Sequence, residues 1–242
     1  LHERGVDLTA SISLPGQMRI SAGLDYSSNR VFDGKDRRFA TMQAMFGSKD
    51  LPGLTKGASL LSYTAFAEFD RRDEPGHPRA GAYLGFTVSS TNGVGGGDFG
   101  FVNSRFDARG YIPLGTKRRV LALRLLGDFN DRKGGSEIPF FRLARLGDLH
   151  TLRGYDTYRF HGRHAITTSI EYRYQLVQGI EAITFADLGQ VFNHRSEFNP
   201  KNLRPTFGGG LQFTSKKSVS FRIMIARSGE GLRFLFGFGP TF

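Results

Sequence analysis

The feature that most constrains this chain is a regular alternation of apolar and polar side chains, which returns in one segment after another. It is clearest in residues 166–176, where aliphatic, aromatic or threonine side chains alternate with Thr167, Ser169, Glu171, Arg173 and Gln175. Successive side chains of a β-strand point to opposite faces of its sheet. This segment is therefore predicted to be a strand with one apolar face and one strongly polar face.

The same alternation predicts an all-β chain of about twelve strands. The segments that carry it are 6–14, 18–26, 39–46, 60–70, 82–89, 101–112, 121–126, 166–176, 180–192, 206–213, 219–226 and 232–238. No segment has the period of a convincing amphipathic helix. An even number of antiparallel strands would place both ends of the chain on one side.

Two architectures fit this alternation, and they differ in which face meets water. In a soluble sandwich the apolar faces pack together and the charges lie outside. In a membrane barrel the apolar faces meet lipid, the polar faces line a wet interior, and the sheet must close on itself. Periodicity alone leaves both open. No run approaches the roughly 18 consecutive apolar residues of a membrane helix, which excludes a helical membrane protein.

The charge and the cysteine content narrow the possible partners and chemistry. The formal net charge is +11, but Lys and Arg are scattered along the whole chain, so anionic lipopolysaccharide or a cation-lined lumen is favoured over nucleic acid. Cysteine is absent, which removes disulfides and thiolate metal sites. Residues 1–10 do not read as a signal peptide, so we expect either a removed leader or a start inside a longer chain.

No motif of a catalytic or cofactor site is found. The hydrolase pattern G-x-S-x-G is missing, and the glycine-rich residues 92–100 lack the ending of a phosphate-binding loop. His161 and His164 have H-x-x-H spacing but lie in a polar loop without a clear third ligand, so they are interpreted as ordinary loop histidines. We expect no enzyme activity, no cofactor and no bound metal.

Six motifs occur in one order along the last three quarters of the chain. They are DRRDEPGHPRAG at 70–81, FDARGYIPLG at 106–115, FFRLARLGDLHTLRGY at 140–155, ITTSIEYRY at 166–174, ITFADLGQVF at 183–192 and FLFGFGPTF at 234–242. Together they resemble the BamA/TamA/FhaC superfamily of bacterial outer-membrane barrels, also called surface antigens. One departure is that the usual glycine pair before the LRGY motif is Leu146 and Gly147 here.

The resemblance implies a specific set of lumen contacts. In this family the loop that carries LRGY folds back into the barrel, and its arginine contacts acidic residues of the inner wall. By motif, Arg153, Gly154 and Tyr155 would meet Glu171 and Asp187, and we call these five residues the lumen lock. Glu171 lies at the polar phase of its strand, which independently predicts that it points inward. The terminal aromatics Phe238 and Phe242 resemble the signal by which such barrels are recognised for assembly.

The resemblance also implies a fold, a location and a function. Residues 1–242 would form one transmembrane, antiparallel, up-and-down β-barrel of the bacterial outer membrane, with a long loop directed into the lumen. Its role would be the insertion of proteins into that membrane or their translocation across it, with lipid, lipopolysaccharide, polypeptide substrate or envelope-complex subunits as partners. The alternative is a short, self-contained barrel that serves as a pore, a membrane anchor or a structural subunit of an envelope complex.

Overall fold

The computed structural model describes residues 2–32, 51–95, 97–215 and 218–242, and it is built almost wholly of β-strands. The strands are β1 (His2–Leu14), β2 (Met18–Arg30), β3 (Ala58–Asp70), β4 (Gly81–Val94), β5 (Gly100–Leu114), β6 (Thr116–Arg132), β7 (Ala144–Leu146), β8 (Phe160–Gly162), β9 (His164–Val177), β10 (Ile180–Phe192), β11 (Arg204–Thr214), β12 (Val219–Ser228) and β13 (Gly231–Phe238). Helical structure in the described ranges is limited to the short turns η1 (Phe140–Arg142), η2 (Arg195–Glu197) and η3 (Pro200–Asn202). No helix among these residues is long and apolar enough to cross a membrane.

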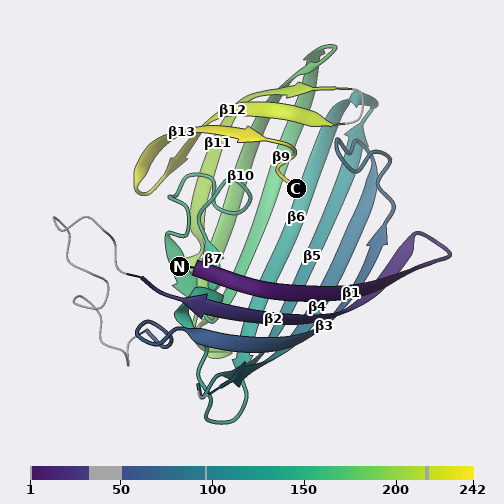
Figure 1. Cartoon of the computed structure of the whole chain (residues 1–242). Helices are drawn as coiled ribbons and strands as arrows, with labels where there is room; N and C mark the ends of the chain where they lie inside the picture. The colour runs from purple at the N-terminus through teal and green to yellow at the C-terminus, as the bar shows by residue number, and fades with distance from the viewer. Residues whose placement is uncertain (1, 33–50, 96, 216–217) are drawn as a thin grey trace.

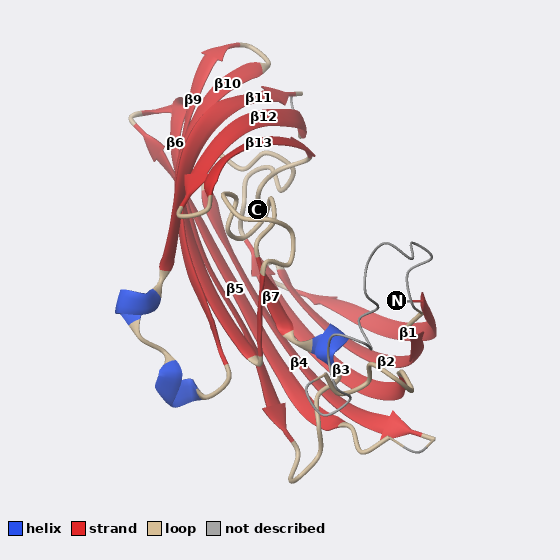
Figure 2. Cartoon of the chain, turned by 90° about the vertical axis from the view of Figure 1, so that its left-hand side faces the viewer, coloured by secondary structure: helices blue, strands red, loops and turns tan. Residues whose placement is uncertain are grey.

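Eleven of the strands form a single antiparallel sheet of up-and-down topology. Each strand pairs with its neighbour in sequence, except that β6 pairs with β9 because β7 and β8 form a small ribbon of their own. That ribbon lies in the segment 133–163, here called the lumen loop. The sheet curls so strongly that β1 and β13 come round to the same side of the molecule, with part of the lumen loop and the C-terminus enclosed by the curve (Figures 1 and 2).

The strand pattern agrees with the sequence in eleven of the twelve predicted segments, and it differs in the placement of the ends. The main sheet has eleven strands, and the segment 39–46 lies outside the described residues. Because β2 pairs directly with β3, an odd number of antiparallel strands results. The start of β1 and the end of β13 therefore lie at opposite ends of the sheet, and the expectation that both ends share one side is wrong.

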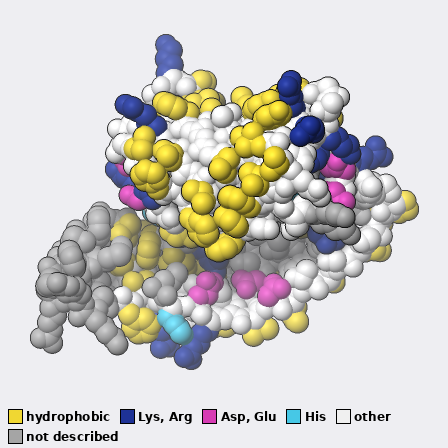
Figure 3. Space-filling model, turned by 90° about the horizontal axis from the view of Figure 1, so that it is seen from above, with side chains coloured by type: hydrophobic (Ala, Val, Ile, Leu, Met, Phe, Trp, Pro, Cys, Tyr) yellow, Lys and Arg dark blue, Asp and Glu magenta, His cyan; other side chains and the backbone are white. Residues whose placement is uncertain are grey.

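The two faces of the sheet have opposite characters. The outer face exposes large apolar side chains, and on the side seen in Figure 3 these gather in a band with Lys and Arg toward its margins. Examples are Val6, Leu8, Leu84, Phe86, Ile170, Phe207, Ile223, Phe234 and Phe236. The inner face instead buries charged residues such as Glu171, Arg173 and Asp187. This is the arrangement of a barrel with an apolar exterior, not that of a sandwich with an apolar core.

The connections also differ between the two ends of the sheet. Short turns join β1 to β2, β5 to β6 and β9 to β10 at one end, and the β1–β2 turn uses Gly16 in the left-handed conformation with φ of 83°. Longer connections lie at the other end, including residues 193–203 and the lumen loop. The lumen loop therefore enters the curve of the sheet from the long-loop end.

Candidate functional site

The centre of the lumen is a fully buried ionic cluster around Arg153, which comes from the lumen loop. The Arg153 guanidinium donates to Asp187 on β10 through Nε (2.9 Å to Oδ2) and Nη2 (2.6 Å to Oδ1). Its Nη1 donates to Glu171 Oε2 on β9 at 2.5 Å. All three side chains have 0 % exposure. The two-pronged contact with Asp187 fixes both the position and the plane of the guanidinium.

Further contacts hold the two carboxylates in place. Asp187 also accepts from the backbone N–H of Arg153 at 3.2 Å and from Thr206 Oγ1 at 3.0 Å. Glu171 accepts from Arg173 Nε at 2.7 Å, and the ring of Phe185 lies 3.5 Å from the Arg153 guanidinium carbon. Burying these charges is costly, so removing one partner leaves the other uncompensated, at about 3–5 kcal/mol. The cluster therefore holds the loop in one position.

Gly154 allows the loop to approach the wall closely. A Cβ at this position would lie 2.9 Å from Ser228 Cβ and 3.0 Å from Thr206 Cβ, so a larger residue would force the turn away from β11 and β12. The carbonyl of Gly154 accepts a hydrogen bond from Ser228 Oγ at 2.8 Å. The requirement for glycine is thus one of space between the turn and the strands.

Tyr155 anchors the other side of the turn in an apolar cluster. Its ring meets that of Phe160 edge-on, with 4.8 Å between the centroids. Leu146, Leu152 and Ala165 complete the buried part of this cluster together with Ala144. The structure therefore brings all five residues of the lumen lock to one place, with Arg153 ion-paired, Gly154 against the strands and Tyr155 packed within the loop.

A second buried charged group lies at the short-turn end, in the connection between β3 and β4. His77 Nε2 lies 3.0 Å from Glu181 Oε2 on β10, and Arg79 pairs with the other oxygen of Glu181. Arg173 Nη1 donates to the carbonyl of Pro78 at 3.3 Å, which links this turn to the lumen lock. Burial, with Arg79 and Arg173 nearby, lowers the pKa of His77 to about 4.

The terminal aromatics occupy different sides of the wall. Phe238 points outward from β13 with 74 % exposure, whereas Phe242 lies in the lumen with 3 % exposure. Phe242 packs with Tyr111, Val120 and Ala122. Four residues separate the two phenylalanines, so both would lie on one face of a continuous strand, but the strand ends at Phe238. Their role as an assembly signal stays a prediction.

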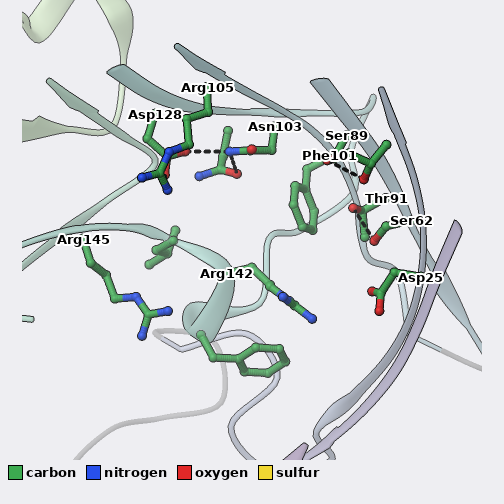
Figure 4. A pocket seen from close by; sticks show the side chains of 14 residues that line it. Asp25, Ser62, Ser89, Thr91, Phe101, Asn103, Arg105, Asp128, Arg142 and Arg145 are labelled. Carbon is green, nitrogen blue, oxygen red and sulfur yellow. Dashed lines mark hydrogen bonds and ion pairs between the residues drawn. The ribbon is translucent and has the colours of Figure 1, made fainter. Parts of the chain in front are cut away.

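The lumen loop leaves part of the lumen open. A cavity of about 440 Å³ lies between the inner wall of β2 to β6 and the loop (Figure 4). Its wall is rich in hydroxyls, which pair across strands as Ser62 with Thr91 at 2.9 Å and Thr64 with Ser89 at 2.8 Å. Arg142 and Arg145 reach into it from the loop side.

The sequence did not single out several residues that complete the site. Arg173 could have been found, since it follows Glu171 by two residues and so shares its inward phase. Thr206 and Arg222 lie outside the six motifs, and Thr241 lies in the last one without an assigned role, so only the folded chain shows that they contact the lock or its neighbours.

The two histidines considered as metal ligands lie in different surroundings. His164 is buried beside the rings of Phe129 and Phe192, with centroids 5.8 and 5.3 Å away, whereas His161 is exposed on β8. Within the described ranges, no group of three or more His, Asp or Glu side chains is arranged to hold a metal ion.

Comparisons with known proteins agree with this architecture. The model of the Omp85 superfamily domain matches residues 2–242. The fold is similar to BamA from Haemophilus ducreyi lacking POTRA domains 1–3, with a TM-score of 0.72, 15 % identity, and coverage of 98 % of this chain and 53 % of that one. It is also similar to CdiB from Acinetobacter baumannii, with a TM-score of 0.60, 13 % identity, and coverage of 93 % and 38 %. The chain thus spans about half of the first structure's length and less of the second's. No curated protein sequence matches it.

Proposed function

Because the chain belongs to the Omp85 superfamily, we propose that it acts in inserting polypeptides into the outer membrane or in translocating them across it. It is an integral outer-membrane β-barrel, so its apolar outer face meets lipid. Outer-membrane barrels have short periplasmic turns and longer extracellular loops. This orients the lumen loop to enter from the cell surface and the turn that carries His77 to face the periplasm.

The observation that carries the proposal is the buried ionic attachment of the lumen loop. A loop held across the lumen by a guanidinium with two carboxylate partners narrows the passage that a passive pore would keep open. Such an attachment is useful where the loop must keep one position while the wall beside it changes. The two outer strands, β1 and β13, each have one partner in the described sheet, so the wall can open or accept a strand there.

The polar cavity supports polypeptide as the substrate class. Its hydroxyls and amides can replace water around a backbone in transit, and polar or charged residues outnumber the apolar lining residues Phe101, Phe141 and Leu143. Lipid and lipopolysaccharide surround the barrel in this proposal, and envelope-complex subunits remain candidate partners. No step in it requires enzymatic chemistry.

The test is Arg153→Ala in the full-length protein in its own outer membrane. Loss of the guanidinium leaves Glu171 and Asp187 buried without their main partner, so we expect the lumen loop to become protease-sensitive. We also expect the amounts of other β-barrels or of secreted polypeptides to fall several-fold. The matched control is Arg159→Ala, because Arg159 lies in the same loop but forms an exposed pair with Glu230.

Two outcomes would count against the proposal. If the loop loosens in Arg153→Ala while barrel assembly and secretion stay normal, the chain is a pore, an anchor or a structural subunit. If Arg159→Ala has an equal effect on assembly, any disturbance of the loop suffices and the lock has no particular role.

A further inference from the structure

The last four residues leave the wall and fold into the lumen. β13 ends at Phe238, and Gly239 takes the left-handed conformation with φ of 72°, which is favourable for glycine. Pro240 follows and has no N–H to continue the ladder. The segment 239–242, here called the tail, therefore turns away from the wall directly after the edge strand.

Three strands and the lumen loop hold the backbone and the ring of the tail. Tyr111 Oη on β5 donates to the carbonyl of Phe242 at 2.8 Å. His150 Nδ1, from the lumen loop, lies 2.8 Å from the carbonyl oxygen of Thr241. The Phe242 ring lies 5.8 Å from the guanidinium carbons of both Arg124 and Arg173. The tail is thus held both by strands of the wall and by the lumen loop.

The Thr241 hydroxyl links two buried charges. It donates to Glu171 Oε2 at 3.2 Å, and the same oxygen accepts from Arg153. The Thr241 hydroxyl also accepts a hydrogen bond from Arg222 Nη1 on β12. Arg222 has 0 % exposure, and its Nε and Nη2 have no hydrogen-bond partner among the described residues. Thr241 therefore gives this buried guanidinium its hydrogen bond and its connection to a carboxylate.

We propose that Thr241 is a positioning residue that couples the lumen lock to the edge strand β13. The path runs from Arg153 through Glu171 and Thr241 to the tail, which continues directly from β13. Loss of the lock weakens the contacts that hold the tail, and release of the tail removes one hydrogen-bond donor from Glu171. This goes beyond the proposed function, and its test needs no assembly or secretion activity.

The test measures amide hydrogen exchange of Gly231–Phe238 in the full-length protein in lipid. Thr241→Val keeps the side-chain shape and removes the hydroxyl, and it does not interrupt the ladder because it lies beyond the last strand. We expect exchange in β13 to accelerate by about fivefold or more. Arg153→Lys should also accelerate it in the wild-type background, but should add little in the Thr241→Val background, because coupled sites are not additive.

Two control variants make the result specific. Thr206→Val removes an equally buried hydroxyl that binds Asp187 instead of Glu171, so Arg153→Lys should still accelerate β13 in that background. Thr241→Ser keeps the hydroxyl and should behave as wild type. Unchanged β13 exchange in Thr241→Val would overturn the proposal. The proposal would also be overturned if Arg153→Lys accelerated exchange in β13 equally with and without the Thr241 hydroxyl. The same holds if Thr206→Val abolished the effect of Arg153→Lys on β13.

Discussion

At the scale of single residues, the lumen contains more arginines than carboxylates, and most of the arginines form ion pairs. Arg153 and Arg173 share Glu171 and Asp187, while Arg222 depends on a hydroxyl. A buried ion pair is often no more stabilising than an apolar replacement, but it is costly to break and strict in geometry. Such a cluster is therefore better suited to fixing a loop than to stabilising a fold.

His77 gives a residue-scale prediction for pH dependence. Its pKa in the folded chain is about 4, below the ordinary value of 6.5, so the folded state favours the neutral ring. Asp73 and Glu181 favour the charged ring but are themselves paired with Lys117 and Arg79. The contribution of His77 to stability is full above pH 6.5 and is lost as the pH falls toward 4, by about 3 kcal/mol.

The measurement is the free energy of unfolding of wild type and His77→Gln in lipid vesicles between pH 7.5 and 4.5. Glutamine can still donate to Glu181 but does not titrate, so wild type should lose more stability than the variant over this range. Parallel curves for the two proteins would contradict the prediction.

The sequence predicted the residues whose position follows from strand phase and motif. Glu171 lies inward because it has the polar phase of a regular strand. Asp187 shares its phase with Ile183 and Phe185, so only the resemblance, which also supplied Arg153, predicted its place. Thr241 could not be found in this way, because its contacts exist only once the tail has turned inward. Side chains that act across the lumen follow no local period.

At the scale of elements, alternation predicts a strand well and predicts nothing beyond its end. The alternating segments became strands in the described ranges, and in β9, β10 and β12 buried and exposed side chains alternate along the strand. The rule fails after Phe238, where Gly239 and Pro240 end the strand and reverse the side on which the next aromatic lies. Glycine followed by proline is visible in the sequence, but this pair alone does not determine on which side of the wall Phe242 lies.

A pair of tryptophan probes tests the placement of the two terminal aromatics. The chain has no tryptophan, so each substitution gives a single emitter. Phe238→Trp should be quenched strongly by lipids with brominated acyl chains, because the side chain points outward. Phe242→Trp should emit at shorter wavelength than an exposed tryptophan and resist this quencher, since it lies in the lumen. Equal quenching of both would show that the tail lies on the outer face.

At the scale of the whole molecule, the lumen has two unlike halves. The half beside β9 to β12 is filled by the lumen loop and its ionic contacts, whereas the half beside β2 to β6 keeps a polar cavity of about 440 Å³. The curled shape and the loop in the lumen followed from the resemblance. The division into halves did not, because it depends on how far the loop leans toward one wall.

Single cysteines test this division in a chain that has none of its own. Ser89 lines the cavity, while Ser169 is buried on the inner face of β9, in register with Asp187. We expect Ser89→Cys to react readily with a water-soluble maleimide and Ser169→Cys to react at least tenfold more slowly. Similar rates at the two positions would mean that the loop does not shield its half of the lumen.

The two edge strands of the described sheet, β1 and β13, run in the same direction, and this sets a parity rule for any polypeptide that closes the sheet, whether it belongs to the same protein or to a partner. Pairing them directly would create one parallel junction in an otherwise antiparallel sheet. A single added strand that runs opposite to both edges is antiparallel to each of them. Further strands must alternate in direction, so they can be added only in pairs. Polypeptide that completes the wall in antiparallel fashion must therefore contribute an odd number of strands, and a lone hairpin cannot do so.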